Sequence, residues 1–538
     1  MTTTPAHRPV PRRSVSRHAV PRRHALRALA VAVVLVGTSA PVFGGTATAA
    51  EPETHTLTIR HLDHDGRPAA AYRTHLAGIF ASGVEQVLEQ QDASGVTTVR
   101  LPKGRYLLDS TLTTGPGTDG PVWTDWIVQP RLDLDRDTTV TFDARTTAPV
   151  DVRPPDDGAR FLQSSMFVDV TYRGVTRSAN IGNRSTNLRV GHLGPETEAG
   201  AVKQWFDSTW ATDSGGYLLG RTFSGTRALT GLSRQYSAQE LGTLNIRGAA
   251  GPGSAGVGLL SIVPSEGASA GAPRVMRTPG TVTFLVAPER GAWDIGFTAP
   301  GADEATRTHY SAERVTVPAG ATATQTFDGP VFGPALTDRP AVSREGDRIT
   351  ADVPLLADGG GHAPWGPTFD TAYTSLYRDG VLVGATSGEP GRGEFTVPPG
   401  RASYRLATTV TRKAAAGATT RVNASWTFSS ATTSGPSALP VSVVRFSPDL
   451  DPAGAAAAGS TLRIPVTVQG AAADGRTRSL TVSASTDDGA SWTRLPLEDG
   501  AVTVRNPSAG TAVSLRAELT DADGNTLDQT LVDAYRTR

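Results

Sequence analysis

The chain has 538 residues, with 51 basic and 51 acidic side chains, 58 glycines, 38 prolines and no cysteine. Without cysteine there can be no disulfide framework and no zinc site built on thiolates. Stability must therefore come from hydrophobic cores, and residues 51–538 are enough for three or four domains.

The first 50 residues have the three parts of a secretion signal. Seven arginines lie between Arg8 and Arg27, an apolar run covers residues 28–36, and small residues end at Ala49 and Ala50. The apolar run is shorter than the roughly 20 residues that cross a bilayer. We expect cleavage near Ala49/Ala50, export by the general (Sec) or the twin-arginine route, and a secreted protein without a membrane span.

Removing this segment changes the charge of the chain. Residues 51–538 carry 44 basic and 51 acidic side chains. A mildly acidic body without a basic block is a poor partner for nucleic acid.

From residue 56 onward, apolar and polar residues alternate in short runs such as Thr56–Arg60, Thr97–Leu101 and Thr138–Phe142. A period of two predicts half-buried strands. Turn pairs separate the runs: Asp65-Gly66, Lys103-Gly104, Asp379-Gly380, Asp488-Gly489 and Asp523-Gly524. The Asp-Gly pairs, flanked by alternating apolar residues, predict hairpins. Helical spacing is weak and confined to Ile79–Gln90 and Ala201–Phe206, so the sequence predicts an all-β protein.

Stretches rich in proline, glycine and serine divide the chain into consecutive β-sandwich domains. After the signal peptide (1–50) we expect a sandwich of the transthyretin or carboxypeptidase-regulatory type at 51–155 and a larger, jelly-roll-like β domain at 156–338. Residues 339–432 have the length of an immunoglobulin or fibronectin III domain, and 439–538 that of a further immunoglobulin-like domain.

Three short motifs resemble catalytic or cofactor sequences but lack the context that the chemistry needs. Asp213–Gly216 matches a serine protease nucleophile loop, yet no histidine has the matching context. Gly267–Gly271 matches the hydrolase elbow without a following helix. Gly251–Gly256 matches the dinucleotide fingerprint, but a strand-like run follows. We predict no catalytic residues and no cofactor.

Two groups of potential metal ligands are equally weak. His61–Gly66 contains two histidines and two aspartates but is typical of a solvated hairpin tip. Asp133, Asp135 and Asp137 alternate without the glycine and glutamate of a calcium loop. We predict no metal site.

An aromatic group stands out in the middle of the chain: Trp205, Phe206, Trp210 and Tyr217. Such a group is either a platform on which a carbohydrate stacks or, as we favour here, the core of a large β domain.

One motif near the C-terminus is more specific. Ser485, Asp487, Gly489 and Trp492 follow the S-x-D-x-G-x-[ST]-W pattern of the Asp-box. The aspartate can accept backbone amide hydrogens across a tight hairpin, while the glycine adopts the left-handed conformation. A single copy does not predict a propeller, so we expect a structural turn.

Several longer phrases resemble a known group of proteins. Arg100–Tyr106, Val331–Ala335, Ser375–Gly380 and Leu439–Phe446, together with the Asp-box segment, resemble the non-catalytic C-terminal β-domain half of large secreted actinobacterial subtilisin-like serine proteases. The resemblance implies a peptidase-associated module. This chain lacks the catalytic domain of those proteases, and no catalytic residue can be transferred to it.

The sequence therefore predicts a secreted, non-catalytic, multidomain β-protein that binds an extracellular or cell-wall polymer, or a protein. It leaves the oligomeric state open. The alternative is a secreted hydrolase, either a serine peptidase or a glycan hydrolase, whose site is assembled from scattered residues. A third hypothesis is an accessory unit for a separately encoded protease.

Overall fold

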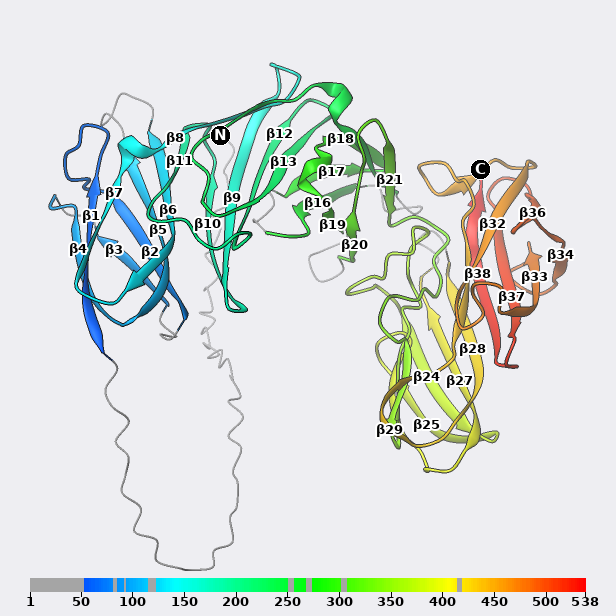
Figure 1. Ribbon diagram of the computed structural model, residues 1–538. Coiled ribbons are helices and arrows are strands. Elements are labelled where there is room, and N and C mark those ends of the chain that lie inside the picture. Colours follow the sequence, from blue (N-terminus) through cyan, green and yellow to red (C-terminus); the bar gives the residue numbers. More distant parts are fainter. Residues whose placement is uncertain are drawn as a thin grey trace, which may run out of the picture. The chain divides into compact units, whose positions relative to one another are not determined.

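The computed structural model describes residues 53–80, 85–90, 93–114, 122–249, 256–267, 273–300, 307–413 and 419–538. The expected signal peptide and most of the motifs at 251–256 and 267–271 lie outside these ranges. Inside them the chain forms β-strands and three short 3-10 helices, with no α-helix (Figure 1). The prediction of an all-β protein is confirmed. No helix in the same ranges is long and apolar enough to cross a membrane.

The N-terminal sandwich packs a three-stranded sheet, in the order β4-β1-β7, on a seven-stranded sheet, in the order β14-β8-β11-β6-β5-β2-β3. Leu57 and Ile59 of the first sheet share a core with Leu76 and Leu108 of the second. The strands are β1 (Thr54–Leu62), β2 (Tyr72–Phe80), β3 (Glu85–Gln90), β4 (Val96–Pro102), β5 (Gly104–Thr114), β6 (Trp123–Leu134), β7 (Thr138–Asp143), β8 (Ala148–Arg153), β11 (Leu188–His192) and β14 (Leu232–Gln235). Since β11 and β14 follow residue 155, this sheet crosses the domain boundary expected there.

The central region is built on a second seven-stranded sheet, in the order β10-β9-β12-β13-β18-β15-β21, which has a core on each face. On one face Met166 and Phe206 pack with Trp126 of the N-terminal sheet. On the other, Leu218 packs with Phe297 of a four-stranded sheet, β17-β16-β19-β20. The strands are β9 (Arg160–Tyr172), β10 (Val175–Asn183), β12 (Val202–Ala211), β13 (Gly215–Gly225), β15 (Gly242–Gly248), β16 (Gly256–Pro264), β17 (Arg274–Thr278), β18 (Gly280–Val286), β19 (Trp293–Thr298), β20 (His309–Val315) and β21 (Thr322–Phe327).

The C-terminal 200 residues form three sheets around one continuous core. The orders are β26-β23-β22-β29, β30-β32-β36-β35, and a long sheet β25-β24-β27-β28-β38-β37-β33-β34, with β31 beside β38. The strands are β22 (Val342–Gly346), β23 (Arg348–Asp352), β24 (Thr371–Arg378), β25 (Val381–Ser387), β26 (Arg392–Thr396), β27 (Ala402–Thr411), β28 (Arg421–Ser430), β29 (Thr433–Ala438), β30 (Ser442–Phe446), β31 (Ala455–Ala456), β32 (Thr461–Gly470), β33 (Thr477–Ser485), β34 (Thr493–Leu495), β35 (Leu497–Glu498), β36 (Ala501–Arg505), β37 (Ala512–Asp521) and β38 (Thr526–Thr537). The pairing of β28 with β38 makes one sheet of the two units expected at 339–432 and 439–538.

Both weak helix predictions are wrong for the residues that the structure describes. Ile79 and Phe80 end β2, and residues 85–90 form β3, its neighbour in the sheet. Residues 202–206 begin β12, which is paired on both sides, with β9 and β13. Pairing within a sheet overrides the weak helical spacing, as propensity alone decides little in a packed domain.

Two of the predicted turns show opposite outcomes. Asp379 and Gly380 have φ values of 49° and 83° between the paired strands β24 and β25, as a tight hairpin requires. Lys103 and Gly104 join β4 to β5, which belong to different sheets. The turn at this second pair is thus a crossover between sheets and not a hairpin.

Candidate functional site

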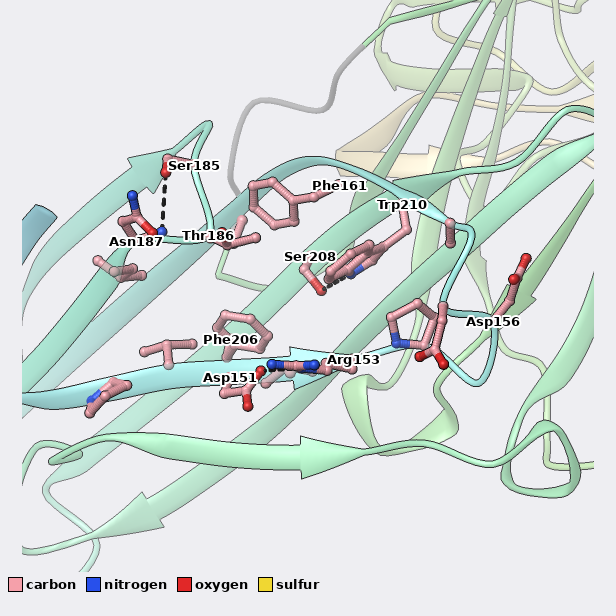
Figure 2. A pocket seen from close by; sticks show the side chains of 18 of the residues that line it. Asp151, Arg153, Asp156, Phe161, Ser185, Thr186, Asn187, Phe206, Ser208 and Trp210 are labelled. Carbon is pink, nitrogen blue, oxygen red and sulfur yellow. Dashed lines mark hydrogen bonds and ion pairs between the residues drawn. The ribbon is translucent and has the colours of Figure 1, made fainter. Parts of the chain in front are cut away.

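A cavity of about 410 Å³ opens where β8 of the N-terminal sheet faces β9 and β12 of the central sheet (Figure 2). Alternate residues of β12 point into it, namely Phe206, Ser208 and Trp210. A strand turns successive side chains to opposite faces of its sheet, so this spacing places all three on one face. We call this cavity the Trp210 pocket.

One wall of the pocket is aromatic, formed by Trp210 and Phe161, and an irregularity in the sheet brings these two residues together. The register of β12 against β9 shifts between Thr209 and Trp210, which pairs Trp210 with Phe161. Such a shift re-aims side chains. The two rings then meet edge to face, with centroids 5.1 Å apart. The Trp210 indole Nε1 donates a 3.1 Å hydrogen bond to Ser208 Oγ, which fixes the ring while leaving part of it exposed.

Carboxylates enter the same cavity from β8 and the loop after it. Asp151 accepts a 2.6 Å hydrogen bond from Arg153 Nε, and Asp156 accepts one of 2.9 Å from the backbone of Gly158. Asp157 also lies on the lining. Three carboxylates against one guanidinium give the pocket a negative character.

Hydroxyl and amide groups complete the lining, since Ser185, Thr186 and Asn187 come from the loop between β10 and β11. The loop is fixed by its own side chains: the Asn187 backbone N–H donates to Ser185 Oγ at 3.1 Å, and Asn187 Nδ2 donates to the Val122 carbonyl at 3.3 Å. These groups can hydrogen-bond a polar ligand without further loop rearrangement.

Trp123 lines the pocket beside this loop, and an arginine contacts its ring. The Arg189 guanidinium lies 3.9 Å from the centroid of the Trp123 ring. Beneath, the fully buried carboxylate of Asp125 accepts a 2.7 Å hydrogen bond from Thr147 and lies 3.0 Å from His64 Nε2. The Trp123 indole is therefore held by the Arg189 cation, which lies next to the hydrogen-bonded network of Asp125.

The four aromatic residues singled out in the sequence divide between the two faces of the sheet. Phe206 and Trp210 line the pocket. Tyr217 lies directly across from Trp210 on β13 but is buried in the core on the same face. Trp205 points to the opposite face, where its ring meets Phe167 edge to face at 5.8 Å.

Sequence reasoning missed Phe161, Trp123 and Asp151. The period of two along residues 206–210 indicates one shared face. The partner strands come from distant parts of the chain, and no local pattern identifies them.

The serine of the protease-like loop has no catalytic setting. Ser214 is exposed in the turn between β12 and β13, where Gly215 N–H donates to Thr212 Oγ1 at 3.1 Å. In the described part of the chain, no hydrogen bond joins Ser214 to a histidine.

The histidines near residue 61 do not belong to a solvated hairpin tip, and that interpretation is wrong. His61 is fully buried and stacks on Tyr72 with ring centroids 3.7 Å apart. His64 pairs with the buried Asp125. The turn itself is confined to the neighbouring residues, where Asp63 accepts the backbone N–H groups of Asp65 and Arg67. Asp133, of the second group, forms ion pairs with Arg105 and Arg131.

The Asp-box residues form a bonded turn between β33 and β34. Asp487 accepts hydrogen bonds from the hydroxyls of Ser485 and Ser491, both at 2.6 Å, and from the Ser491 backbone at 2.9 Å. Gly489 has a φ of 89°, and a Cβ built on it would lie 3.3 Å from the Trp492 ring. All of these contacts are local to the turn.

No family model and no curated protein matches the chain. Among solved structures it is similar to BcpA, the major pilin subunit of Bacillus cereus, with 10% identity over 51% of this chain and 99% of that chain and a TM-score of 0.12. The Salmonella alpha-2-macroglobulin reacted with methylamine gives 11% identity, 89% and 39% coverage and a TM-score of 0.15. The FN1-FN3 domains of chicken CNTN1 give 9% identity, 64% and 97% coverage and a TM-score of 0.12. At such scores the whole chains do not superpose, and the similarities carry no conclusion about function.

Proposed function

We propose that the chain is a secreted, non-catalytic binding protein that holds an uncharged glycan segment of an extracellular or cell-wall polymer in the Trp210 pocket. The observation that carries the proposal is the meeting of a partly exposed indole wall with three carboxylates in one cavity. The apolar face of a sugar ring stacks on an aromatic side chain, and sugar hydroxyls donate hydrogen bonds to carboxylates and amides.

The charge of the pocket selects among ligands. Asp151 forms an ion pair with Arg153, whereas Asp156 and Asp157 form none among the described residues, although the charge of Asp157 also acts on Arg153. An anionic ligand would be repelled here, whereas hydroxyl groups supply the donors that free carboxylates accept.

The rival function, hydrolysis of a glycan or peptide, has less support. A glycan hydrolase uses as its general acid a carboxyl that stays protonated near neutral pH. Burial raises the pKa of Asp328 to about 7, but Asp328 lies outside the lining of the pocket. The third hypothesis, an accessory unit for a separately encoded protease, is supported only by the resemblance in sequence to the β-domains of secreted proteases.

The test uses the full chain purified without its signal segment, incubated with insoluble chitin, cellulose and bacterial cell-wall material. Trp210→Ala should reduce retention on the polymer that binds by at least about tenfold, because stacking on an aromatic ring is lost. The matched control is Trp365→Ala, which removes a tryptophan that is 75% exposed and lies outside the pocket.

Retention lost with Trp365→Ala but kept with Trp210→Ala would reject this site. Release of reducing ends from the bound polymer by the unmodified protein would instead favour the hydrolase.

A further inference from the structure

A second, larger cavity lies on the opposite face of the same central sheet. Its volume is about 960 Å³, and its walls come from β9, β10 and β12 on one side and from β16 and β17 on the other. The strand β12 serves both cavities: Ser208 and Trp210 line the first, and Thr209 and Ala211 line the second.

The charge of this second cavity is the reverse of the first. Its lining holds Arg160, Arg184 and Arg274 and no aspartate or glutamate among the described residues. Residues 51–538 are mildly acidic, with 44 basic and 51 acidic side chains, so three arginines on a lining without an aspartate or glutamate are a local departure. We call this cavity the arginine groove.

The three arginines are not used to hold the fold through ion pairs. Within the described ranges, Arg160 and Arg184 form no salt bridge, and both are exposed. Arg274 donates to the backbone carbonyls of Gly215 and Thr212, which are neutral groups. The positive charges are therefore left for a ligand.

The turn that resembles a protease nucleophile loop in sequence, Asp213–Gly216, helps to build this groove. Gly215 closely approaches β18, since a Cβ built on it would lie 1.7 Å from the Thr283 carbonyl oxygen. Only glycine fits there, and this tight pairing carries the carbonyl that orients Arg274. The turn thus positions a cation rather than a nucleophile.

The electrostatics agree with an uncompensated cluster. Burial and then the charge of Arg160 lower the pKa of Arg274. The buried Asp207 accepts a hydrogen bond from Ser165 of the lining and lies 3.7 Å from the buried guanidinium of Arg290. Its charge is thus already balanced by another arginine.

The remaining polar lining suits a hydroxylated ligand. Gln163, Asn180, Asn183, Thr209 and Thr212 all reach the groove. Amides both donate and accept, so they can bond the hydroxyls that lie between charged groups of a sugar chain. Guanidinium groups match carboxylates with paired hydrogen bonds.

We propose that the arginine groove is a second binding site, specific for an anionic glycan whose sugar units carry carboxylates. A nucleic acid fits less well, because neither aromatic ring on the lining is free: Phe167 packs edge to face on Trp205, and Phe284 is buried in the core. Single strands need exposed rings on which bases stack.

The experiment measures binding of oligogalacturonate to the full purified chain by titration calorimetry, with a neutral oligosaccharide of equal length, inorganic phosphate and single-stranded DNA as parallel probes. We expect oligogalacturonate to bind, and Arg184→Glu to weaken it at least tenfold. The double variant Arg160→Gln/Arg184→Gln should weaken it as well, because it makes the same net charge change by removing two guanidinium groups. The matched control is Arg494→Glu, which makes the same charge change at an exposed position outside the groove.

Equal loss in Arg494→Glu and Arg184→Glu would overturn the proposal, because it would show a response to net charge alone. Absence of oligogalacturonate binding would overturn it as well, as would phosphate or DNA binding that depends on the same arginines at equal or higher affinity. Because Trp210→Ala leaves the groove intact, it should not change oligogalacturonate binding, so failure at one site is distinguishable from failure at the other.

Discussion

Trp426 on β28 lies directly opposite Leu527 on β38, and its indole Nε1 donates a 2.7 Å hydrogen bond to the carbonyl of Ser442. The ring is almost fully buried. One side chain therefore joins strands that the sequence assigned to separate immunoglobulin-like units.

The first prediction is that residues 339–538 unfold as one cooperative unit. Trp426→Ala should lower the free energy of unfolding by about 3–5 kcal/mol, because it leaves a large cavity and an unpaired carbonyl. Chemical denaturation followed by circular dichroism should show the whole C-terminal transition shifting to lower denaturant. Trp365→Ala, at an exposed ring, should change it by less than about 0.5 kcal/mol. Two transitions, of which only one shifts, would show that the units are independent.

The second prediction concerns the turn at Asp487. Hydrogen bonds from the hydroxyls of Ser485 and Ser491 lower the pKa of Asp487 to about 2. A lowered pKa in the folded state stabilises the fold above the ordinary value near 4, and this contribution is lost as the pH falls toward 2. Asp487→Ala should therefore lower the melting temperature at pH 7. The gap to the unmodified protein should narrow as the pH approaches 2, as scanning calorimetry can measure. A gap that stays constant with pH would mean that the carboxylate charge has no role.

Local patterns were enough to predict the strands and several turns, because alternation and Asp-Gly pairs act within a few residues. Asp379-Gly380 is an example. The same patterns could not show that β11 and β14 return to the N-terminal sheet, or that β28 pairs with β38, because strand pairing is long-range and leaves no local signal.

The candidate site shows the same division. Phe206 and Trp210 could be singled out as part of an aromatic group. That they lie on the opposite side of the sheet from Trp205 follows only once the face that each residue of the strand occupies is known. Phe161 joins the pocket only through a register shift in the β9–β12 pair. The arginine groove could not be predicted, since Arg160, Arg184 and Arg274 are widely spaced in the chain.

The third prediction rests on His61, whose pKa burial lowers to about 4. The Gly95 carbonyl can only accept, so Nδ1 carries the hydrogen at 3.1 Å, and Nε2 accepts from Thr74 Oγ1 at 2.7 Å. A second proton on the ring would break the bond from Thr74. The unfolded chain binds that proton near pH 6.5, so His61 by itself lowers the free energy of unfolding as the pH drops from about 6.5 to 4. His61→Asn should remove this contribution, which changes the pH dependence measured by urea titration between pH 4 and 6.5; an unchanged pH dependence would contradict the assignment.

The fourth prediction has the opposite sign and rests on Asp328. Burial raises its pKa to about 7, and its carboxyl accepts a 3.0 Å hydrogen bond from Tyr310. Between about pH 4 and 7 the folded state holds a proton that the unfolded chain has released. The free energy of unfolding should therefore fall as the pH rises across this range, by at most about 1.4 kcal/mol per pH unit.

Asp328→Asn is the variant that tests this prediction best, since asparagine tolerates the left-handed backbone at this position, where φ is 57°. This variant should remove the fall in the free energy of unfolding with rising pH. The rise in that free energy due to His61 should then be visible between pH 4 and 6.5. His61→Asn should do the reverse. Because the two slopes oppose each other in the unmodified protein, its own stability should vary less with pH than that of either variant. A variant Asp328→Asn with an undiminished fall toward pH 7 would show that another group takes up the proton.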